Sequence, residues 1–136
     1  MVFAMHVLLV DDHPVIHETL RAMVRLVRPG AEVHSQFDLA GGLSEASRLD
    51  ELKLVVLDLG LPGCSGVDAL VRFRSALPQA RVVVISANDD AERVRTALDE
   101  GAVGYLPKTM RPKAMAEALR TLLDGGTYVP PQALQA

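Results

Sequence analysis

Short, continuous runs of hydrophobic residues recur along the chain and are separated by longer segments of mixed polarity. The clearest runs cover residues 7–10, 54–57 and 82–85. Runs without alternation are typical of strands buried on both faces, and their many β-branched residues favour strand over buried helix. Residues 102–106 form a weaker, glycine-interrupted run, and residues 32–35 alternate in polarity as an edge strand does. The pattern therefore predicts five strands.

The segments between these runs carry apolar residues at helical spacing. The predicted helices begin near Ile16, at Asp38, near Val67, at Asp89 and at Pro112. Asp89 and Glu92 have the spacing of a capping box, which makes Asp89 the expected N-cap of the fourth helix. Alternating strands and helices predict an α/β fold, in which helices cover both faces of a parallel sheet.

Composition limits the class of protein. The chain has 136 residues, the size of one domain, and 49% of them are hydrophobic, which is enough for a core. Its net charge of −3 argues against binding nucleic acid or an anionic membrane by bulk charge. The single cysteine, Cys64, excludes an internal disulfide and a thiolate metal site. Because no membrane span or signal peptide is evident, we expect a cytoplasmic domain.

Polar side chains follow four of the predicted strands at the point where each strand ends. They are Asp11 and Asp12, then Asp58, then Ser86, and finally Lys108. Ligands of open parallel sheets bind beyond the carboxyl ends of the strands. We therefore expect three carboxylates, one hydroxyl and one ammonium to converge on one edge of the sheet.

This set of groups suits phosphoryl transfer to a carboxylate. Crowded carboxylates need a compensating cation, and oxygen ligands select Mg²⁺ or a similar divalent cation such as Mn²⁺. The Lys108 ammonium and the Ser86 hydroxyl suit phosphoryl oxygens. Taken alone, each residue has an ordinary alternative role as a turn former, helix cap or surface charge. Asp58 is the exception, because it ends an apolar run where an unpartnered charge is costly.

Four short motifs together resemble the receiver domain of two-component response regulators. They are Val10-Asp11-Asp12-His13-Pro14, Leu57-Asp58-Leu59-Gly60-Leu61-Pro62-Gly63, Ser86-Ala87 and Gly104-Tyr105-Leu106-Pro107-Lys108. Each motif alone is weak, but the ordered combination is specific and covers residues 6–125. The resemblance implies a doubly wound, flavodoxin-like (βα)5 fold whose five-stranded parallel sheet has the strand order 2-1-3-4-5.

The resemblance also implies how a phosphoryl group and a metal ion bind. Asp58 would be the phosphorylation site, and a cognate sensor histidine kinase would supply the phosphoryl group. Asp12 would bind Mg²⁺ directly and Asp11 mainly through water. The Asp58 carboxylate and the Gly60 backbone carbonyl would complete the metal ligands.

A second group of residues would respond to phosphorylation, again by resemblance. Ser86 and Lys108 would bind the phosphoryl oxygens. Ser86 and Tyr105 would form the switch, in which the Tyr105 ring turns from solvent toward the core. Such a domain is not an enzyme in the usual sense, although it takes part in its own phosphorylation and autodephosphorylation.

Two finer features are similar to the LuxR-type, NarL/FixJ-like class of receivers. They are Asp11-Asp12-His13-Pro14 and the ending Gly125-Gly126-Thr127-Tyr128-Val129-Pro130. The similarity implies a receiver over residues 1–126 and the start of a linker over residues 127–136, truncated before a helix-turn-helix DNA-binding domain. It also implies transcriptional control with DNA contacts made only by that domain, homodimers on phosphorylation and no membrane partner.

Two other functions remain as alternatives. A stand-alone receiver, or an interaction module without DNA output, would carry the same fold. A haloacid-dehalogenase-type phosphatase also uses an aspartate nucleophile after a strand together with Mg²⁺. It needs a second aspartate two residues later, however, where this chain has Gly60.

The four histidines are a separate candidate for metal binding. They are His6, His13, His17 and His34, and they fall on different predicted elements. We therefore do not expect them to share a metal site.

Overall fold

Five parallel strands form one sheet in the order β2-β1-β3-β4-β5 in the computed structural model, which describes residues 5–134. The strands are β1 (Met5–Val10), β2 (Ala31–Gln36), β3 (Leu52–Asp58), β4 (Val82–Ser86) and β5 (Gly104–Pro107). All five predicted strands are present, and the alternating segment is the edge strand β2. The predicted fold class and strand order are confirmed.

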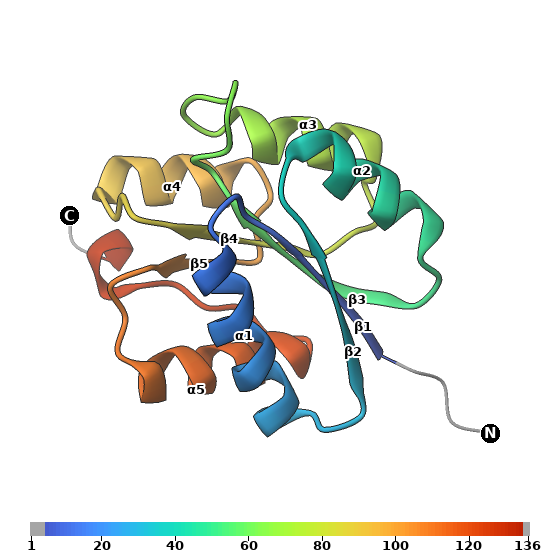
Figure 1. Cartoon of the computed structure of the whole chain (residues 1–136). Coiled ribbons are helices and arrows are strands. Elements are labelled where there is room, and N and C mark those ends of the chain that lie inside the picture. The colour runs from blue at the N-terminus through green and yellow to red at the C-terminus, as the bar shows by residue number, and fades with distance from the viewer. Residues whose placement is uncertain (1–4, 135–136) are drawn as a thin grey trace.

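Helices cover both faces of the sheet, as Figure 1 shows. The helices are α1 (Pro14–Val27), α2 (Leu39–Arg48), α3 (Asp68–Ala76), α4 (Ala91–Asp99) and α5 (Pro112–Leu123). Helices α1 and α5 lie on one face, and α2, α3 and α4 lie on the other. The molecule therefore has three layers, with the sheet in the middle.

The central strands have no polar face because each side of the sheet carries its own hydrophobic core. Along β1, Val7 and Leu9 pack in the core on the side of α1 and α5. Leu8 and Val10 point the other way, into the core beneath α2 and α3. Alternate side chains of a strand lie on opposite faces, so burial of both faces explains the continuous apolar runs.

Side-chain caps fix where two of the helices begin. The Asp38 carboxylate accepts a hydrogen bond from the Gly41 backbone N–H at 2.7 Å and starts α2. The expectation that Asp89 caps α4 is wrong, because the N-cap is Asp90, whose carboxylate accepts from the Glu92 N–H at 2.9 Å. The Asn88 side chain accepts from the Asp90 N–H and forms the preceding turn, which shifts the helix start by one residue.

The segment after α5 packs against the domain. Tyr128 forms a bridge with Gly104 of β5, and its carbonyl accepts from the Tyr105 N–H at 3.2 Å. A short 3-10 helix, η1 (Pro131–Leu134), contacts α4. The division into a receiver and a linker at residues 126 and 127 stays a prediction.

The two ends of the chain bear on earlier expectations. No signal peptide is expected at the start of the chain, but residues 1–4 lie outside the described residues. The same holds for residues 135–136, at the end of the expected linker. Within residues 5–134, no helix has the length and apolar character needed to cross a membrane.

Candidate functional site

The predicted site residues converge on the carboxyl edge of the sheet. Asp58 is the last residue of β3, and Ser86 is the last residue of β4. Asp11 directly follows β1, and Lys108 directly follows β5. Neighbouring parallel strands end together, which brings side chains distant in the sequence to one place.

Three carboxylates form the centre of this site. One carboxylate oxygen each from Asp11, Asp12 and Asp58 lies within 4.8 Å of the others. Asp11 and Asp58 are buried, with 1% and 2% of their surface exposed. Asp11 Oδ2, Asp12 Oδ1 and Asp58 Oδ2 are buried oxygens that accept no hydrogen bond of acceptable geometry. Buried negative charge without well-aligned donors is costly, so the site favours a bound cation.

Lys108 supplies part of the positive charge. Its Nζ lies 3.0 Å from Asp11 Oδ2 and 3.5 Å from Asp58 Oδ2. The Lys108 backbone N–H donates to the Ser86 carbonyl at 2.8 Å, which ties the start of the loop to β4. The lysine is thus held beside two of the three carboxylates.

Burial raises the pKa of the Asp58 carboxyl above its ordinary value of 3.8. Repulsion from Asp11 and Asp12 also raises this pKa, whereas the Gly60 N–H and the Lys108 ammonium lower it. The Gly60 N–H donates to Asp58 Oδ1 at 3.0 Å. The charged form of Asp58 is therefore less favoured than that of an exposed carboxyl, and a further cation would compensate it.

The donor set fits a magnesium ion. Three carboxylates offer unshared lone pairs, and hard oxygen ligands are those that Mg²⁺ and Mn²⁺ prefer. A Cβ atom at Gly60 would be in van der Waals contact with Asp58 Oδ1, at 3.5 Å, so the glycine leaves this side of the carboxylate uncovered. The part of the Gly60 carbonyl as a metal ligand stays a prediction.

Ser86 lies at the same edge, but its hydroxyl contacts the following loop. Its Oγ accepts from the Asn88 N–H at 3.0 Å. The residue before it, Ile85, is the register partner of Asp58. Ser86 thus lies on the strand next to the acceptor, while its part in binding a phosphoryl group stays a prediction.

Tyr105 differs from its expected starting position. We expected its ring to turn inward from solvent, but the ring is already fully buried in the core beneath α4. Its hydroxyl donates to the Asn88 carbonyl, so the buried polar end is satisfied, and burial raises its pKa. The inward position thus needs no change at Asp58, and the switch role of Tyr105 stays a prediction.

His13 also belongs to the site, a position that was not predicted from the sequence. Its Nδ1 lies 2.8 Å from Asp11 Oδ1, 3.1 Å from Asp12 Oδ1 and 3.4 Å from Lys108 Nζ. His13 is the N-cap residue of α1 and directly follows the two aspartates. Its position directly after Asp11 and Asp12 is the sequence signal that could have predicted an imidazole beside these carboxylates.

His17 binds the backbone of the loop that carries the first two aspartates. Its Nε2 donates to the Asp11 carbonyl at 2.6 Å, since a carbonyl can only accept. Its Nδ1 lies 3.0 Å from Ser35 Oγ, which in turn accepts from Arg21 at 2.6 Å. This chain of hydrogen bonds joins α1 and β2 to the loop that carries Asp11 and Asp12.

Comparison with known proteins identifies the family of the chain. Residues 7–120 match the response regulator receiver domain family. The chain is 35% identical over 129 residues to a glycerol metabolism activator of Pseudomonas putida, covering 95% of this chain and 58% of the activator. It is 36% identical over 120 residues to the nitrate/nitrite response regulator protein NarP of Escherichia coli, covering 88% of this chain and 55% of NarP.

A solved structure agrees with these relatives. The crystal structure of a LuxR family DNA-binding response regulator from Silicibacter pomeroyi superposes with a TM-score of 0.79 at 26% identity. The match covers 95% of this chain and 98% of that chain. The chain therefore spans a little over half the length of the curated relatives it matches, and nearly all of one solved chain.

Proposed function

Since the chain belongs to the response regulator receiver domain family and is related to LuxR-type transcriptional regulators, we propose that it accepts a phosphoryl group on Asp58 from a sensor histidine kinase. The observation that carries this proposal is the buried Asp58 carboxylate at the end of β3. Its Oδ2 lies beside Lys108 and accepts no hydrogen bond. A lone pair in that setting is free to attack.

The two oxygens of Asp58 have different parts in the reaction. Oδ1 accepts from the Gly60 N–H, which fixes the orientation of the carboxylate. Oδ2 therefore attacks phosphorus as the phosphorus–nitrogen bond of the phosphohistidine donor breaks. The electron pair of that bond stays with the departing imidazole, and the product is an acyl phosphate on Asp58.

Other residues neutralise charge as the phosphoryl group arrives. Asp11, Asp12, Asp58 and the Gly60 carbonyl would hold Mg²⁺ or Mn²⁺, which supplies positive charge for the phosphoryl oxygens. Lys108 leaves its contact with Asp58 Oδ2 to pair with a phosphoryl oxygen. The Ser86 hydroxyl accepts a hydrogen bond from the Asn88 N–H, so its own hydrogen is available and donates to a second phosphoryl oxygen.

The output of the domain is transcriptional in this proposal. Residues 1–126 act as the receiver and residues 127–136 begin a linker to a helix-turn-helix domain, which makes the DNA contacts. Phosphorylation favours a homodimer through rearrangement at Ser86 and Tyr105, and the protein works in the cytoplasm with its kinase. The relatives that include transcriptional regulators support this output over a stand-alone module.

The chemistry is tested by incubating the chain with acetyl phosphate and Mg²⁺ and measuring its intact mass. We expect the mass of one added phosphoryl group, lost on base or hydroxylamine treatment and absent from Asp58→Asn. Asp50→Asn, a matched change at an exposed residue, should keep the modification. Equal modification of Asp58→Asn would contradict the proposal. Steady phosphate release from small phosphoesters would instead favour a phosphatase of the haloacid-dehalogenase type.

A further inference from the structure

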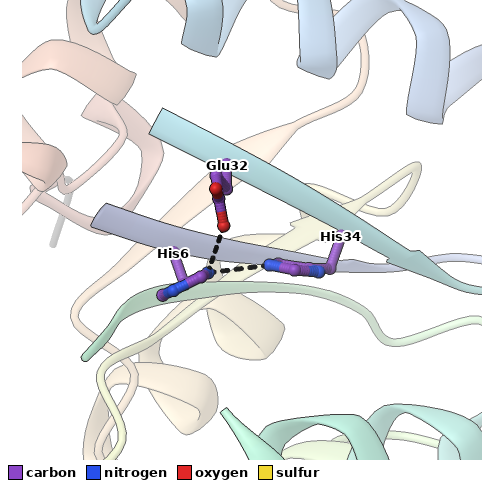
Figure 2. Close-up of side chains that lie close together, drawn as sticks. All are labelled: His6, Glu32 and His34. Atoms are coloured by element: carbon purple, nitrogen blue, oxygen red, sulfur yellow. Dashed lines mark hydrogen bonds and ion pairs between the residues drawn. The ribbon is translucent and has the colours of Figure 1, made fainter. Parts of the chain in front are cut away.

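A second group of metal-ligating side chains lies at the opposite end of the sheet from the carboxylates. Figure 2 shows that His6 of β1 points toward Glu32 and His34 of β2. His6 Nδ1 lies 2.9 Å from His34 Nε2 and 3.3 Å from Glu32 Oε2. One ligand atom from each residue lies within 4.8 Å of the others.

His6 and His34 lie side by side although they fall on different strands. In the parallel register of β1 and β2, His6 pairs with Glu32, and Leu8 pairs with His34. Residues two apart in a strand share a face. The register therefore puts both imidazoles and the carboxylate on one side of the sheet, although the histidines are 28 residues apart.

The spacing of the three ligand atoms is close to that of a zinc site. Zinc bonds of about 2.0–2.1 Å in a tetrahedron place ligand atoms about 3.3 Å apart. The separation of His6 Nδ1 and Glu32 Oε2 equals this value, and that of the two imidazole nitrogens needs to widen by only a few tenths of an ångström. Two imidazoles and one glutamate are also the protein ligands of known zinc sites that keep one position for water.

The surroundings suit a bound cation. His34 turns its other nitrogen, Nδ1, toward Glu45 Oε1 at 3.9 Å, and Glu45 is in turn paired with Arg48. This separation is too long for a hydrogen bond, so Glu45 contributes nearby negative charge and not a hydrogen-bonded partner of the imidazole. The side chains of His6 and His34 are 20% and 23% exposed, whereas Glu32 is 58% exposed, which leaves a path for an ion from solvent.

We propose that His6, Glu32 and His34 form a binding site for a zinc-like divalent transition metal, separate from the magnesium site. The ion takes the place of the proton between His6 Nδ1 and His34 Nε2, and the ring that loses this proton takes one up from solvent on its other nitrogen, so each ring binds as a neutral imidazole. His6 and Asp11 are five positions apart along the chain, or about 16.5 Å at about 3.3 Å per residue. Imidazole ligands favour zinc over magnesium, so the two sites differ in chemistry as well as in place.

Binding at this site clamps the edge strand. β2 hydrogen-bonds only to β1 among the described strands, and the ion joins side chains of both. The same two strands lead to the phosphoryl site, since Asp11 follows β1 and Ser35 of β2 contacts His17. Zinc therefore stabilises the sheet edge on which the loop of Asp11 and Asp12 rests.

The test is a Zn²⁺ titration of the untagged chain in excess Mg²⁺, which occupies the acidic cluster. Long-range proton–nitrogen NMR of the histidine side chains reports which nitrogens bind, and calorimetry gives the affinity. We expect the His6 Nδ1 and His34 Nε2 signals to shift on binding of one ion. Glu32→Gln and His34→Gln should each weaken Zn²⁺ binding at least about 10-fold. Loss of a residue that only hydrogen-bonds to a metal ligand already lowers metal affinity by about that factor.

Matched controls separate this site from the acidic cluster. Glu18→Gln removes an equivalent charge from an exposed position of α1 and should leave Zn²⁺ binding unchanged. Shifts confined to His13, absence of any histidine shift, or wild-type affinity in Glu32→Gln would overturn the proposal. The wild-type spectrum decides the question even if His34→Gln fails to fold.

Discussion

Replacing Asp58 by asparagine should stabilise the protein when no divalent metal is present. The substitution removes one of three crowded negative charges and keeps the shape of the side chain. The amide oxygen of asparagine still accepts from the Gly60 N–H, as Asp58 Oδ1 does at 3.0 Å. The change therefore isolates the electrostatic cost of charge at this position.

The size of the effect follows from the distances at the site. The ligand oxygens of Asp11 and Asp12 lie within 4.8 Å of that of Asp58, so at an effective dielectric constant of about 20 each repulsion costs at least about 3.5 kcal/mol. The attraction between Lys108 Nζ and Asp58 Oδ2, which are 3.5 Å apart, offsets about 4.7 kcal/mol of this repulsion. Asp58→Asn should thus raise the free energy of unfolding by about 2 kcal/mol, or Tm by about 6–10 °C for a domain of this size.

The assay is thermal unfolding in EDTA, followed by circular dichroism. Asp50→Asn removes the same charge at an exposed site and should shift Tm by no more than about 1–2 °C, as surface substitutions usually do. An Asp58→Asn protein that melts at or below the wild-type temperature in EDTA would refute the charge-crowding argument.

Three further results are expected. Mg²⁺ at ten times its Kd should stabilise the wild type by about 1.4 kcal/mol in thermal unfolding, and Asp12→Ala should lose most of this gain. Burial raises the pKa of Asp58, so in the absence of metal the folded protein loses stability as the pH rises from about 4 through that raised pKa. In unfolding experiments at a series of pH values, the stability advantage of Asp58→Asn should therefore grow over this range and vanish at lower pH. Gly42→Ala should lower the free energy of unfolding by about 1–2 kcal/mol in denaturant unfolding, because the added Cβ would lie 2.8 and 2.9 Å from the Val10 methyl groups. This overpacking outweighs the gain in helix propensity. Gly30→Ala, which has open space around it, should leave the free energy of unfolding unchanged.

The strands and the edge that carries the site were predictable from local pattern. Continuous apolar runs report burial on both faces, which β1 and β3 confirm, and a charge at the end of such a run marks Asp58. The family and the strand order followed from the ordered motifs. These features depend on residues close together in the sequence, where propensity and burial act directly.

Contacts that depend on register or rotamer were not predictable. His6 meets His34 only because β1 and β2 pair in one particular register. His13 turns its ring over Asp11 and Asp12 by a choice of side-chain rotamer at the start of α1. The Tyr105 ring lies inward and its hydroxyl donates to the Asn88 carbonyl, a contact between residues 17 positions apart.

The central claim, that Asp58 accepts the phosphoryl group, is tested most directly by locating the modified residue. The chain is treated with acetyl phosphate and Mg²⁺, the acyl phosphate is reduced with borohydride to homoserine, and peptides are sequenced by mass spectrometry. The account predicts homoserine at position 58 alone, only when Mg²⁺ is present. Homoserine at position 11 or 12, or an unmodified position 58 in a phosphorylated chain, would contradict it.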